Sequence, residues 1–205
     1  MFILGLTGSL GMGKSTTARF FAEEGVPVHD ADAVVHRLYE GEAVAAIEAA
    51  FPGTTGAGKV DRNKLAARVL GDAAALQRLE AIVHPLVHDA ERRLLAKAQA
   101  RGEQVAVLDI PLLFETGGDR RVDAVVVVTA PLHVQRARVL GRPDMTAAKF
   151  DVILAKQLPD AEKRRRAHFL VDSSGSFDSL RAQIRGILRA VAMIRGRSHR
   201  PAHRA

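Results

Sequence analysis

Short apolar runs alternate with helical periodicities along this chain, and the alternation predicts an α/β fold. The first run, Phe2–Leu6, is typical of a buried strand. Four further strand candidates follow, at Val26–His29, Gln104–Asp109, Ala124–Thr129 and His168–Asp172. The middle two are almost continuously apolar, as expected for strands that are buried on both faces of a parallel sheet. Because helical stretches lie between the strands, we predict a three-layer α/β fold.

Two connections between the strand candidates are longer than a parallel crossover requires, which is about a dozen residues. The connection from Asp30 to Arg101 has no good strand pattern but contains several amphipathic helical patterns, at Ala43–Phe51, Arg62–Leu70, Ala75–Ile82 and Val87–Ala100. The connection from Arg136 to Arg166 is helical and rich in arginine. We therefore predict a helical insertion at the ligand edge of the sheet and a lid that closes over phosphates.

Length and composition favour one domain with an insertion, because 205 residues can bury a substantial core. No apolar run approaches the length of a membrane-spanning helix. The chain begins with a core strand that leads directly into a glycine-rich loop, so we do not expect a signal peptide. Cysteine is absent, which excludes disulfides and thiolate chemistry and agrees with a cytoplasmic location.

The net charge of +7 comes mainly from the C-terminal end of the chain. Five of the 30 basic residues and none of the 23 acidic residues lie in the segment 189–205, so the rest of the chain is nearly neutral. We interpret this segment as a solvated tail that frays beyond Ile194. The alternative is that the tail binds nucleic acid or anionic lipid.

The strongest chemical signal is the segment Gly8–Ser15, GSLGMGKS, which fits the phosphate-binding loop G-x-x-x-x-G-K-[ST]. Its glycines let the backbone curl so that successive N–H groups converge on phosphates. In such a loop Lys14 reaches the β- and γ-phosphates, and the Ser15 hydroxyl ligates Mg²⁺. A strand before the loop and an amphipathic helix after it, ending at Gly25, are the setting that this motif requires.

Acidic side chains follow two further strand candidates. Asp109 ends the run QVAVLD and suits a metal role, with capping of the next segment as the alternative. Asp30 and Asp32 follow the second strand candidate, and either can be the N-cap of the next helix. Both cannot fill that one position, so one carboxylate remains to accept a proton from an attacking hydroxyl.

Basic groups and a histidine pair complete the candidate chemistry. Two groups of basic residues in the predicted lid are candidates for phosphate contacts: Arg136, Arg138 and Arg142 near its start, and 163–166 at its end. Their spacing does not tell which of these seven contact phosphate. His84 and His88 have the i, i+4 spacing of metal ligands, but no cluster of His or Cys lies near them in the sequence. Pro85 suits the first turn of a helix, so we expect a structural pair there.

With these residues identified, the chain resembles the dephospho-CoA kinase family from Ile3 to about Ile187. The most family-specific stretch is DIPLLFETG, Asp109–Gly117. The other matching blocks are GLTGSLGMGKSTTA, Asp30–Asp32, Val60–Arg62 with Leu65, Leu79–Glu80, His84–Pro85, Gln135 with Arg138 and Arg142, Gln157–Pro159, Lys163–Arg164, and Asp172 with Ser174–Ser176. A phosphate-binding loop alone would indicate only a superfamily, whereas these blocks together are close to specific.

The resemblance implies ATP-dependent phosphorylation of the ribose 3′-hydroxyl of dephospho-CoA, the final step of coenzyme A biosynthesis. It implies a P-loop kinase fold with a parallel five-stranded sheet, a helical substrate-binding insertion and a helical lid. The expected bounds are a core of 1–29, 102–135 and 167–194, an insertion of about 30–101, a lid of about 136–166 and a basic tail of 195–205.

The resemblance also implies roles for individual residues. Asp32 is the expected base on the 3′-hydroxyl, and Lys14 and Arg138 stabilise the transferring phosphoryl group. The ATP contacts carried over are Gly8, Gly11, Met12, Gly13, Lys14, Ser15, Thr16 and Arg142. The substrate contacts are Asp32, Asp61, Arg62, His84 and Leu112, and Mg²⁺ is assigned to Ser15 and Asp109.

Four positions depart from the family pattern. Met12 stands where the loop often has a small residue, and His29 where an apolar residue is common. His168 replaces the usual Asp, and Ser173 replaces a frequent Asn. The last two bear on the lid hinge and on the adenine side, so we carry over no contact to either of them.

Three other functions fit parts of this sequence but fit the whole chain less well. A GTPase switch needs the motif N-K-x-D, and Asn63-Lys64 is followed by Leu65 and Ala66. A nucleic-acid-dependent ATPase would explain the high pI, but the nearly neutral body and the scarcity of aromatic residues argue against it. Another nucleoside or nucleotide kinase is the nearer alternative.

We expect ATP and dephospho-CoA as partners, no membrane, and a monomer, although the sequence leaves self-association open.

Overall fold

The computed structural model describes residues 1–143 and 145–194. The chain forms two compact units: Met1–His29 with the chain from Ala98 onward, here called the sheet unit, and Asp30–Lys97, here called the helical unit. The proposed basic tail, 195–205, lies outside the described residues.

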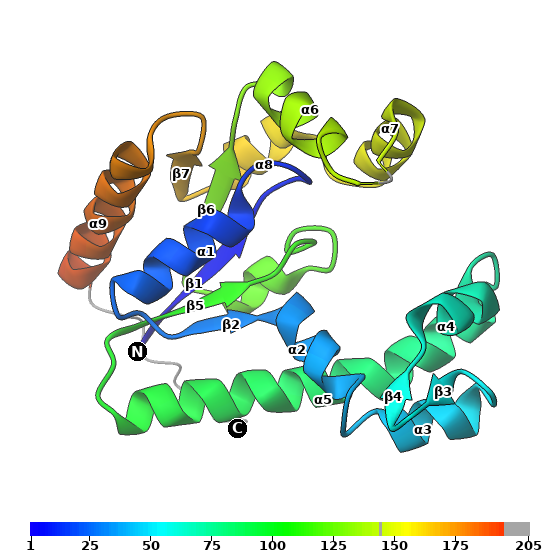
Figure 1. Cartoon of the computed structure of the whole chain (residues 1–205). Coiled ribbons are helices and arrows are strands. Elements are labelled where there is room, and N and C mark those ends of the chain that lie inside the picture. The colour runs from blue at the N-terminus through cyan, green and yellow to red at the C-terminus, as the bar shows by residue number, and fades with distance from the viewer. Residues whose placement is uncertain (144, 195–205) are drawn as a thin grey trace, which may run out of the picture. The chain divides into compact units, whose positions relative to one another are not determined.

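The sheet unit is built on five strands in the order β2-β5-β1-β6-β7 (Figure 1). Their bounds are β1 Phe2–Thr7, β2 Val28–Asp30, β5 Val105–Asp109, β6 Ala124–Thr129 and β7 Phe169–Asp172. The strand β1 pairs in parallel with both β5 and β6, and β6 pairs in parallel with β7. The predicted parallel five-stranded sheet is therefore confirmed, with β2 starting only after Pro27, which has no N–H to donate to a ladder.

Helices cover both faces of this sheet, and the alternation along β6 explains why. Val126 and Val128 face a core that includes α1 (Lys14–Glu23) and α9 (Phe177–Met193). Val125 and Val127 point to the other face and pack against the segment after β5 and residues next to α8 (Asp160–Arg166). Figure 1 shows α1 and α9 on one side and α8 on the other. The three-layer prediction is confirmed.

The remaining elements of the sheet unit follow β5 and β6. A single 3₁₀ turn, Gly118–Arg121, precedes β6. After β6 come α6 (Leu132–Leu140) and α7 (Ala147–Ala155), and then α8. The segment from 136 to 166, where a helical lid was predicted, is thus largely helical.

The helical unit contains α2 (Ala31–Leu38), α3 (Val44–Ala50), α4 (Arg62–Val69) and most of α5 (Ala73–Ala100) around a core of its own. It also contains a hairpin of two-residue strands, β3 (Thr55–Gly56) and β4 (Lys59–Val60). The expectation of no strand in this region was wrong. Such short strands leave no periodicity in the sequence, and the hairpin depends on Ala57 and Gly58, which both have positive φ.

One continuous helix, α5, runs where two were predicted, and Pro85 lies in its interior instead of in a first turn. An interior proline costs a helix about 3 kcal/mol or more, because it removes a hydrogen bond and crowds the preceding turn. Apolar side chains on both sides of Pro85, such as Val83 and Leu86, belong to the same hydrophobic core. Their burial keeps the helix continuous, so tertiary packing outweighs the local preference.

No helix within residues 1–143 and 145–194 is both long and apolar enough to cross a membrane.

Candidate active site

The segment Gly8–Ser15 forms a loop between β1 and α1, as its motif requires. Gly11 and Gly13 adopt left-handed backbone angles, with φ of 81° and 84°. A Cβ atom on Gly11 would lie 2.4 Å from Val139 Cγ2, so the space as well as the conformation requires glycine there. Gly13 is the N-cap of α1, and the helix begins at Lys14. The free N–H groups at this helix start favour an anion.

Lys14 and Asp109 meet at the carboxyl ends of two adjacent strands. Lys14 Nζ lies 2.7 Å from Asp109 Oδ1, and the Asp109 side chain is only 1% exposed. The pair forms because β1 and β5 are parallel and in register, with Leu6 opposite Asp109. A buried carboxylate requires such a counter-charge, because burial strongly disfavours an unpaired charge.

The oxygens near this ion pair have the chemistry that Mg²⁺ prefers. Ser15 is exposed in the first turn of α1, and Asp109 ends the neighbouring strand β5. Mg²⁺ in nucleotide sites usually takes one or two protein oxygens, with phosphates and waters as its other ligands. Within the described part of the chain no group of three or more His, Cys, Asp or Glu is placed to hold a metal alone. This donor set fits a magnesium ion that arrives with a nucleotide.

Two glutamines hold the phosphate loop from outside. Gln157 Oε1 accepts a hydrogen bond from the Leu10 N–H at 3.1 Å, and Gln135 Nε2 donates to the Leu10 carbonyl at 2.7 Å. Gln135 is buried on α6, and Gln157 follows α7. Both backbone groups of Leu10 are therefore fixed by residues from the predicted lid segment.

Arg138 lies beside the same loop through contacts with Ser173. The Arg138 guanidinium donates to Ser173 Oγ at 2.9 Å and to the Ser173 carbonyl at 2.7 Å. Ser173 Oγ in turn donates to the Met12 carbonyl at 2.7 Å. Ser173 was not among the predicted contacts, and its position directly after the last strand is the one sequence signal for it. Arg142 is exposed just beyond the end of α6.

In the helical unit, the structure decides between Asp30 and Asp32. Asp30 is the N-cap of α2, and its carboxylate accepts a hydrogen bond from the Ala33 N–H at 2.9 Å. Asp32 lies exposed in the first turn of α2. Among the residues the structure describes, none forms a hydrogen bond or ion pair with the Asp32 side chain. Asp30 is thus the cap of α2, and Asp32 is the carboxylate that the cap leaves over.

Comparison with known proteins shows to which family this chain belongs. A family model described as dephospho-CoA kinase matches residues 2–179. This chain belongs to the dephospho-CoA kinase family. A dephospho-CoA kinase of Rhodopseudomonas palustris (strain BisB18) is 66% identical over 192 residues, which are 94% of this chain and 96% of the relative.

Solved structures share the fold of this chain. A crystal structure of a Thermus thermophilus protein has a TM-score of 0.78 at 36% identity and covers 92% of this chain and 97% of its own. The structure of the dephospho-CoA kinase from Campylobacter jejuni has a TM-score of 0.63 at 20% identity, covering 92% and 96% of the two chains. The latter likeness supports the shared fold alone, and the fold is that of the P-loop kinases.

Two departures from the family pattern have clear structural consequences. Met12 is buried, and its Sδ accepts a hydrogen bond from the Ala130 N–H at 3.1 Å. His168 Nδ1 accepts from the Val125 N–H at 3.1 Å, while the His168 N–H donates to the Val125 carbonyl. An imidazole nitrogen there can therefore replace a carboxylate oxygen as the acceptor that extends the pairing of β6 and β7.

The family-specific stretch DIPLLFETG anchors the segment around α8 through Glu115. The Glu115 carboxylate accepts from the Leu158 N–H at 2.8 Å and lies 3.0 Å from Lys163 Nζ. The Lys163 side chain is fully buried. Burial alone would raise the pKa of Glu115, but the Leu158 hydrogen bond and the Lys163 ammonium outweigh it and hold that pKa below its ordinary value. Glu115 was not among the predicted site residues, because its partners are more than 40 residues away.

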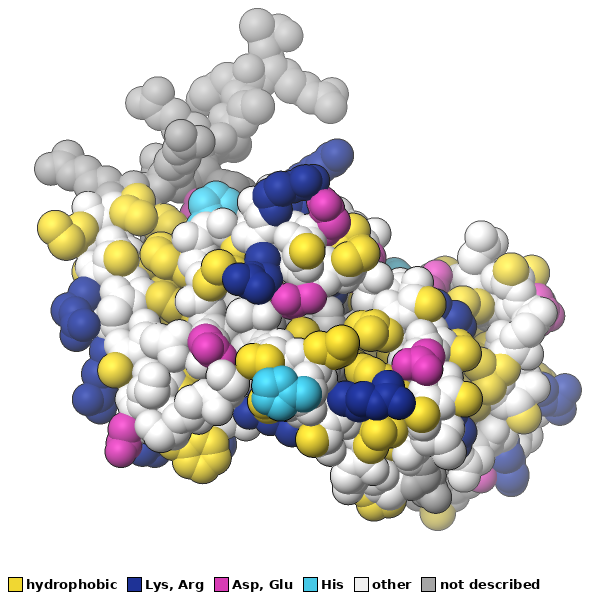
Figure 2. Space-filling view, turned by 90° about the horizontal axis from the view of Figure 1, so that it is seen from above, with side chains coloured by type: hydrophobic (Ala, Val, Ile, Leu, Met, Phe, Trp, Pro, Cys, Tyr) yellow, Lys and Arg dark blue, Asp and Glu magenta, His cyan; other side chains and the backbone are white. Residues whose placement is uncertain are grey.

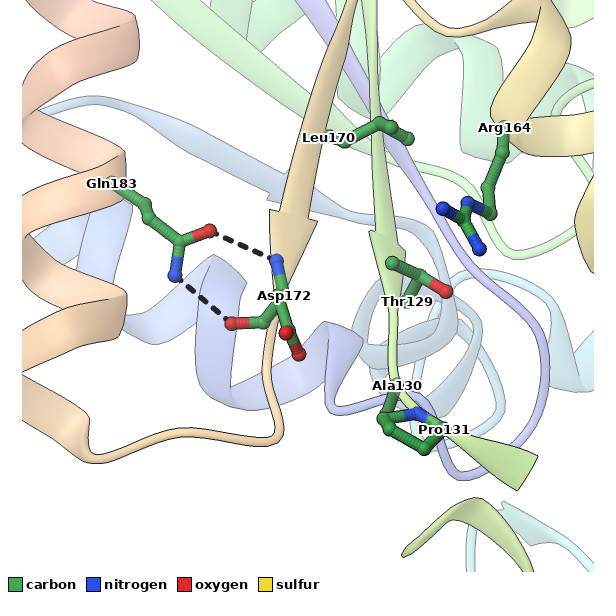
Figure 3. A pocket seen from close by; sticks show the side chains of 7 residues that line it. All are labelled: Thr129, Ala130, Pro131, Arg164, Leu170, Asp172 and Gln183. Atoms are coloured by element: carbon green, nitrogen blue, oxygen red, sulfur yellow. Dashed lines mark hydrogen bonds between the residues drawn. The ribbon is translucent and has the colours of Figure 1, made fainter. Parts of the chain in front are cut away.

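A cavity of about 310 Å³ opens at the ends of β6 and β7 (Figure 3). Gln183 from α9 and Arg164 from α8 lie on opposite sides of the end of β7 (Figure 3). Gln183 clamps the backbone of Asp172 by accepting from its N–H and donating to its carbonyl. Hydrogen bonds from Ser174, with smaller contributions from Arg138 and Arg164, lower the pKa of Asp172. Asp172 therefore stays negatively charged at neutral pH.

The predicted substrate residues lie in both units. Asp61 is the N-cap of α4 and accepts from the Asn63 and Lys64 N–H groups. Arg62 lies over the Tyr39 ring at 5.8 Å from its centroid, and burial raises the pKa of Tyr39 although Arg62 opposes this shift. His84 is exposed on α5. Leu112, in the segment after β5 of the sheet unit, is 40% exposed.

Proposed function

We propose that this protein transfers the γ-phosphoryl group of ATP to the ribose 3′-hydroxyl of dephospho-CoA, giving coenzyme A and ADP. The observation that carries the proposal is the identity of 66% to a dephospho-CoA kinase over 94% of this chain. The phosphate loop with Lys14 and the buried Asp109 supports the ATP-binding half of the reaction. Such a reaction would be the last step of coenzyme A biosynthesis.

On the donor side, Gly8 and the loop residues from Gly11 to Thr16 bind the phosphates together with the positive start of α1. Lys14 and Arg138 stabilise the negative charge that spreads over the γ-phosphate oxygens during transfer, and Arg142 contacts ATP from beyond α6. Ser15 and Asp109 would hold Mg²⁺, whose charge neutralises the β- and γ-phosphate oxygens when it is bound. The Asp109 carboxylate already pairs with the Lys14 ammonium at 2.7 Å, which supports its use toward a second cation, Mg²⁺.

On the acceptor side, Asp32 takes the proton of the 3′-hydroxyl. The hydroxyl oxygen then forms a bond to the γ-phosphorus while the bond from that phosphorus to the β,γ-bridging oxygen breaks, and ADP leaves. Asp32 suits this role because its carboxylate is exposed in the first turn of α2, whereas Asp30 is occupied as the cap. Asp61, Arg62, His84 and Leu112 are the candidates for contacts to the rest of dephospho-CoA.

The surface supports nucleotides as partners in preference to nucleic acid. On the face drawn in Figure 2, the Lys and Arg side chains of the described residues are scattered among hydrophobic, acidic and uncharged groups. A nucleic-acid interface is expected to gather such charges into a patch or a stripe. Because both substrates are water-soluble nucleotides, we place the reaction in the cytoplasm. We also expect a monomer to suffice for the reaction.

An acceptor panel tests the proposal directly. The protein is incubated with Mg-ATP and, separately, dephospho-CoA, adenosine or a nucleoside monophosphate, and ADP formation is measured with the mass of the product. We expect ADP only with dephospho-CoA, whose mass rises by one phosphoryl group. Phosphorylation of a nucleoside or a nucleoside monophosphate without phosphorylation of dephospho-CoA would contradict the substrate assignment.

A further inference from the structure

The Ser173 hydroxyl occupies a buried position between the phosphate loop and Arg138. Ser173 is 7% exposed, and its N–H donates to the Thr129 carbonyl, which fixes its backbone beside the end of β6. A Cβ atom on Gly13 would lie 2.9 Å from Ser173 Oγ, so the serine lies directly against the loop backbone. A serine hydroxyl has one proton to donate and two lone pairs. It can therefore bind Met12 and Arg138 at the same time, as it does here.

The bond from Ser173 to the Met12 carbonyl has a geometric consequence for Gly13. The Met12–Gly13 peptide is trans, as are the other peptide bonds of the described residues. In a planar trans peptide the C=O and the following N–H point in opposite directions. Holding the Met12 carbonyl on Ser173 Oγ at 2.7 Å therefore turns the Gly13 N–H away from Ser173. That N–H belongs to the set of loop amides that would converge on a bound phosphate.

The second consequence concerns Arg138. Two different nitrogens of its guanidinium bind Ser173, one to Oγ and one to the backbone carbonyl. Two contacts from one planar group fix its orientation as well as its position. The Arg138 Nη1 atom also lies 3.5 Å from the position that a Cβ atom on Gly13 would occupy. The arginine is thus held against the loop.

We infer that Ser173 is a positioning residue that sets both the Gly13 amide and the Arg138 guanidinium for the phosphates of ATP. Ser173 acts through these two groups and does not itself transfer a proton or bind the reacting atoms. The inference rests on the proposed function for the use of Arg138 toward ATP. It goes beyond that function, because the chemistry of the reaction does not require a serine at this position.

Nucleotide binding without dephospho-CoA tests the inference separately from the choice of acceptor. The affinity for a non-hydrolysable ATP analogue with Mg²⁺ is measured by calorimetry for the wild type, Ser173→Ala and the control Ser179→Ala. Ser179 is an exposed serine on α9. Hydrogen bonds to charged groups contribute about 1.5–3 kcal/mol, which corresponds to a loss of affinity of roughly ten- to a hundredfold for Ser173→Ala. Wild-type affinity in Ser173→Ala would overturn the inference.

Two further measurements separate positioning from a general effect on packing. In steady-state assays Ser173→Ala should raise the KM for ATP and leave the KM for dephospho-CoA within about twofold of the wild type. In a double-mutant cycle, Ser173→Ala should cost at least about fivefold less affinity when Arg138 is already alanine. Equal rises in both KM values, or independent effects in the cycle, would overturn the inference.

A charge-conserving change keeps the test valid if Ser173→Ala does not fold. Arg138→Lys retains the positive charge at an exposed position, but one ammonium cannot reproduce the planar, two-nitrogen contact with Ser173. We expect its affinity for the ATP analogue to fall about tenfold. Wild-type affinity would show that the orientation set by Ser173 is unimportant. A wild-type protein that bound no ATP analogue would instead contradict the proposed function.

Discussion

The phosphate-loop region and the start of the helical unit carry the two halves of the proposed chemistry in different ways. Around the loop, Leu10, Met12 and Lys14 each have a fixed partner from a distant part of the chain. At the start of the helical unit, Asp30 is fixed by a local cap while Asp32 is exposed. The loop region is therefore fixed by contacts with distant parts of the chain, whereas the proposed base is held only by its own helix.

This difference predicts two kinds of mutational response. Removing one member of a buried, charged pair costs several kcal/mol of stability, because it leaves the other member unpaired. Changing an exposed group usually alters stability by less than about 0.5 kcal/mol. Substitutions around the loop should therefore affect folding and ATP binding together, whereas substitution of Asp32 should affect the reaction alone.

The largest effect is expected for Lys14→Ala. Activity should fall by at least about a thousandfold, because the variant loses the charge that stabilises the γ-phosphate during transfer. The variant should also unfold at a lower temperature, since the buried Asp109 loses its 2.7 Å partner. ADP formation and thermal unfolding measure the two effects. A folded Lys14→Ala protein with substantial activity would contradict the loop assignment.

Asp32→Asn should lower the turnover number by roughly a hundred- to ten-thousandfold, the usual effect of removing a general base. Its unfolding temperature should stay near the wild-type value, because the exposed side chain forms no hydrogen bond or ion pair among the described residues. Asp30→Ala is the matched control. It loses the cap of α2 and should cost about 1 kcal/mol of stability. An Asp32→Asn protein with wild-type turnover would remove Asp32 from the role of base.

The sequence predicts the phosphate loop itself better than it predicts the distant residues that bind the loop. GSLGMGKS and the apolar strand runs are local patterns, and the structure has the predicted strand before the loop, the helix after it and the strand that ends at Asp109. The same patterns could not predict that Ser173 binds Met12, because those residues are 161 positions apart and their contact depends on the order of the strands. In the helical unit the sequence left Asp30 and Asp32 as alternatives, since both can cap a helix and only geometry distinguishes them.

Predictions from local sequence preferences were also wrong where tertiary packing opposed those preferences. Pro85 indicated a helix start, yet burial of apolar side chains on both sides of it keeps α5 continuous. Met12 departs from the small residue that is frequent at this position of the loop. Its burial, and the hydrogen bond that its Sδ accepts from the Ala130 N–H, follow only from the three-dimensional structure. In both places the deciding term is tertiary packing, which a single sequence does not show.

Glu115→Gln tests the support of the α8 segment. The folded pKa of Glu115 lies below its ordinary value of about 4.5, so its contribution to stability is complete above that pH and is lost as the pH falls through the folded pKa. Acid should therefore destabilise the wild type more steeply than Glu115→Gln. At pH 7 the variant should lose about 2–3 kcal/mol, because the fully buried Lys163 has lost its counter-charge.

The double variant Glu115→Gln/Lys163→Met provides the control for that prediction. It removes both charges and leaves no buried ammonium unpaired, so it should be more stable than Glu115→Gln alone. Urea unfolding at pH 4 and pH 7 gives the free energy of unfolding of each protein. An acid dependence that is the same in the wild type and Glu115→Gln would show that Glu115 is not stabilised in its charged form.

The smallest effect is expected at Asp61, where capping and substrate binding can be separated. Asp61→Ala removes the acceptor for the Asn63 and Lys64 N–H groups and should cost about 1 kcal/mol of stability. Asp61→Ser keeps an oxygen at the cap but loses the charge, so its unfolding temperature should stay near that of the wild type. If Asp61 contacts dephospho-CoA as proposed, both variants should raise the KM for dephospho-CoA and leave the KM for ATP unchanged. If Asp61→Ser has a normal KM for dephospho-CoA while Asp61→Ala is less stable, Asp61 only caps α4. Other exposed residues would then have to provide the contacts to dephospho-CoA.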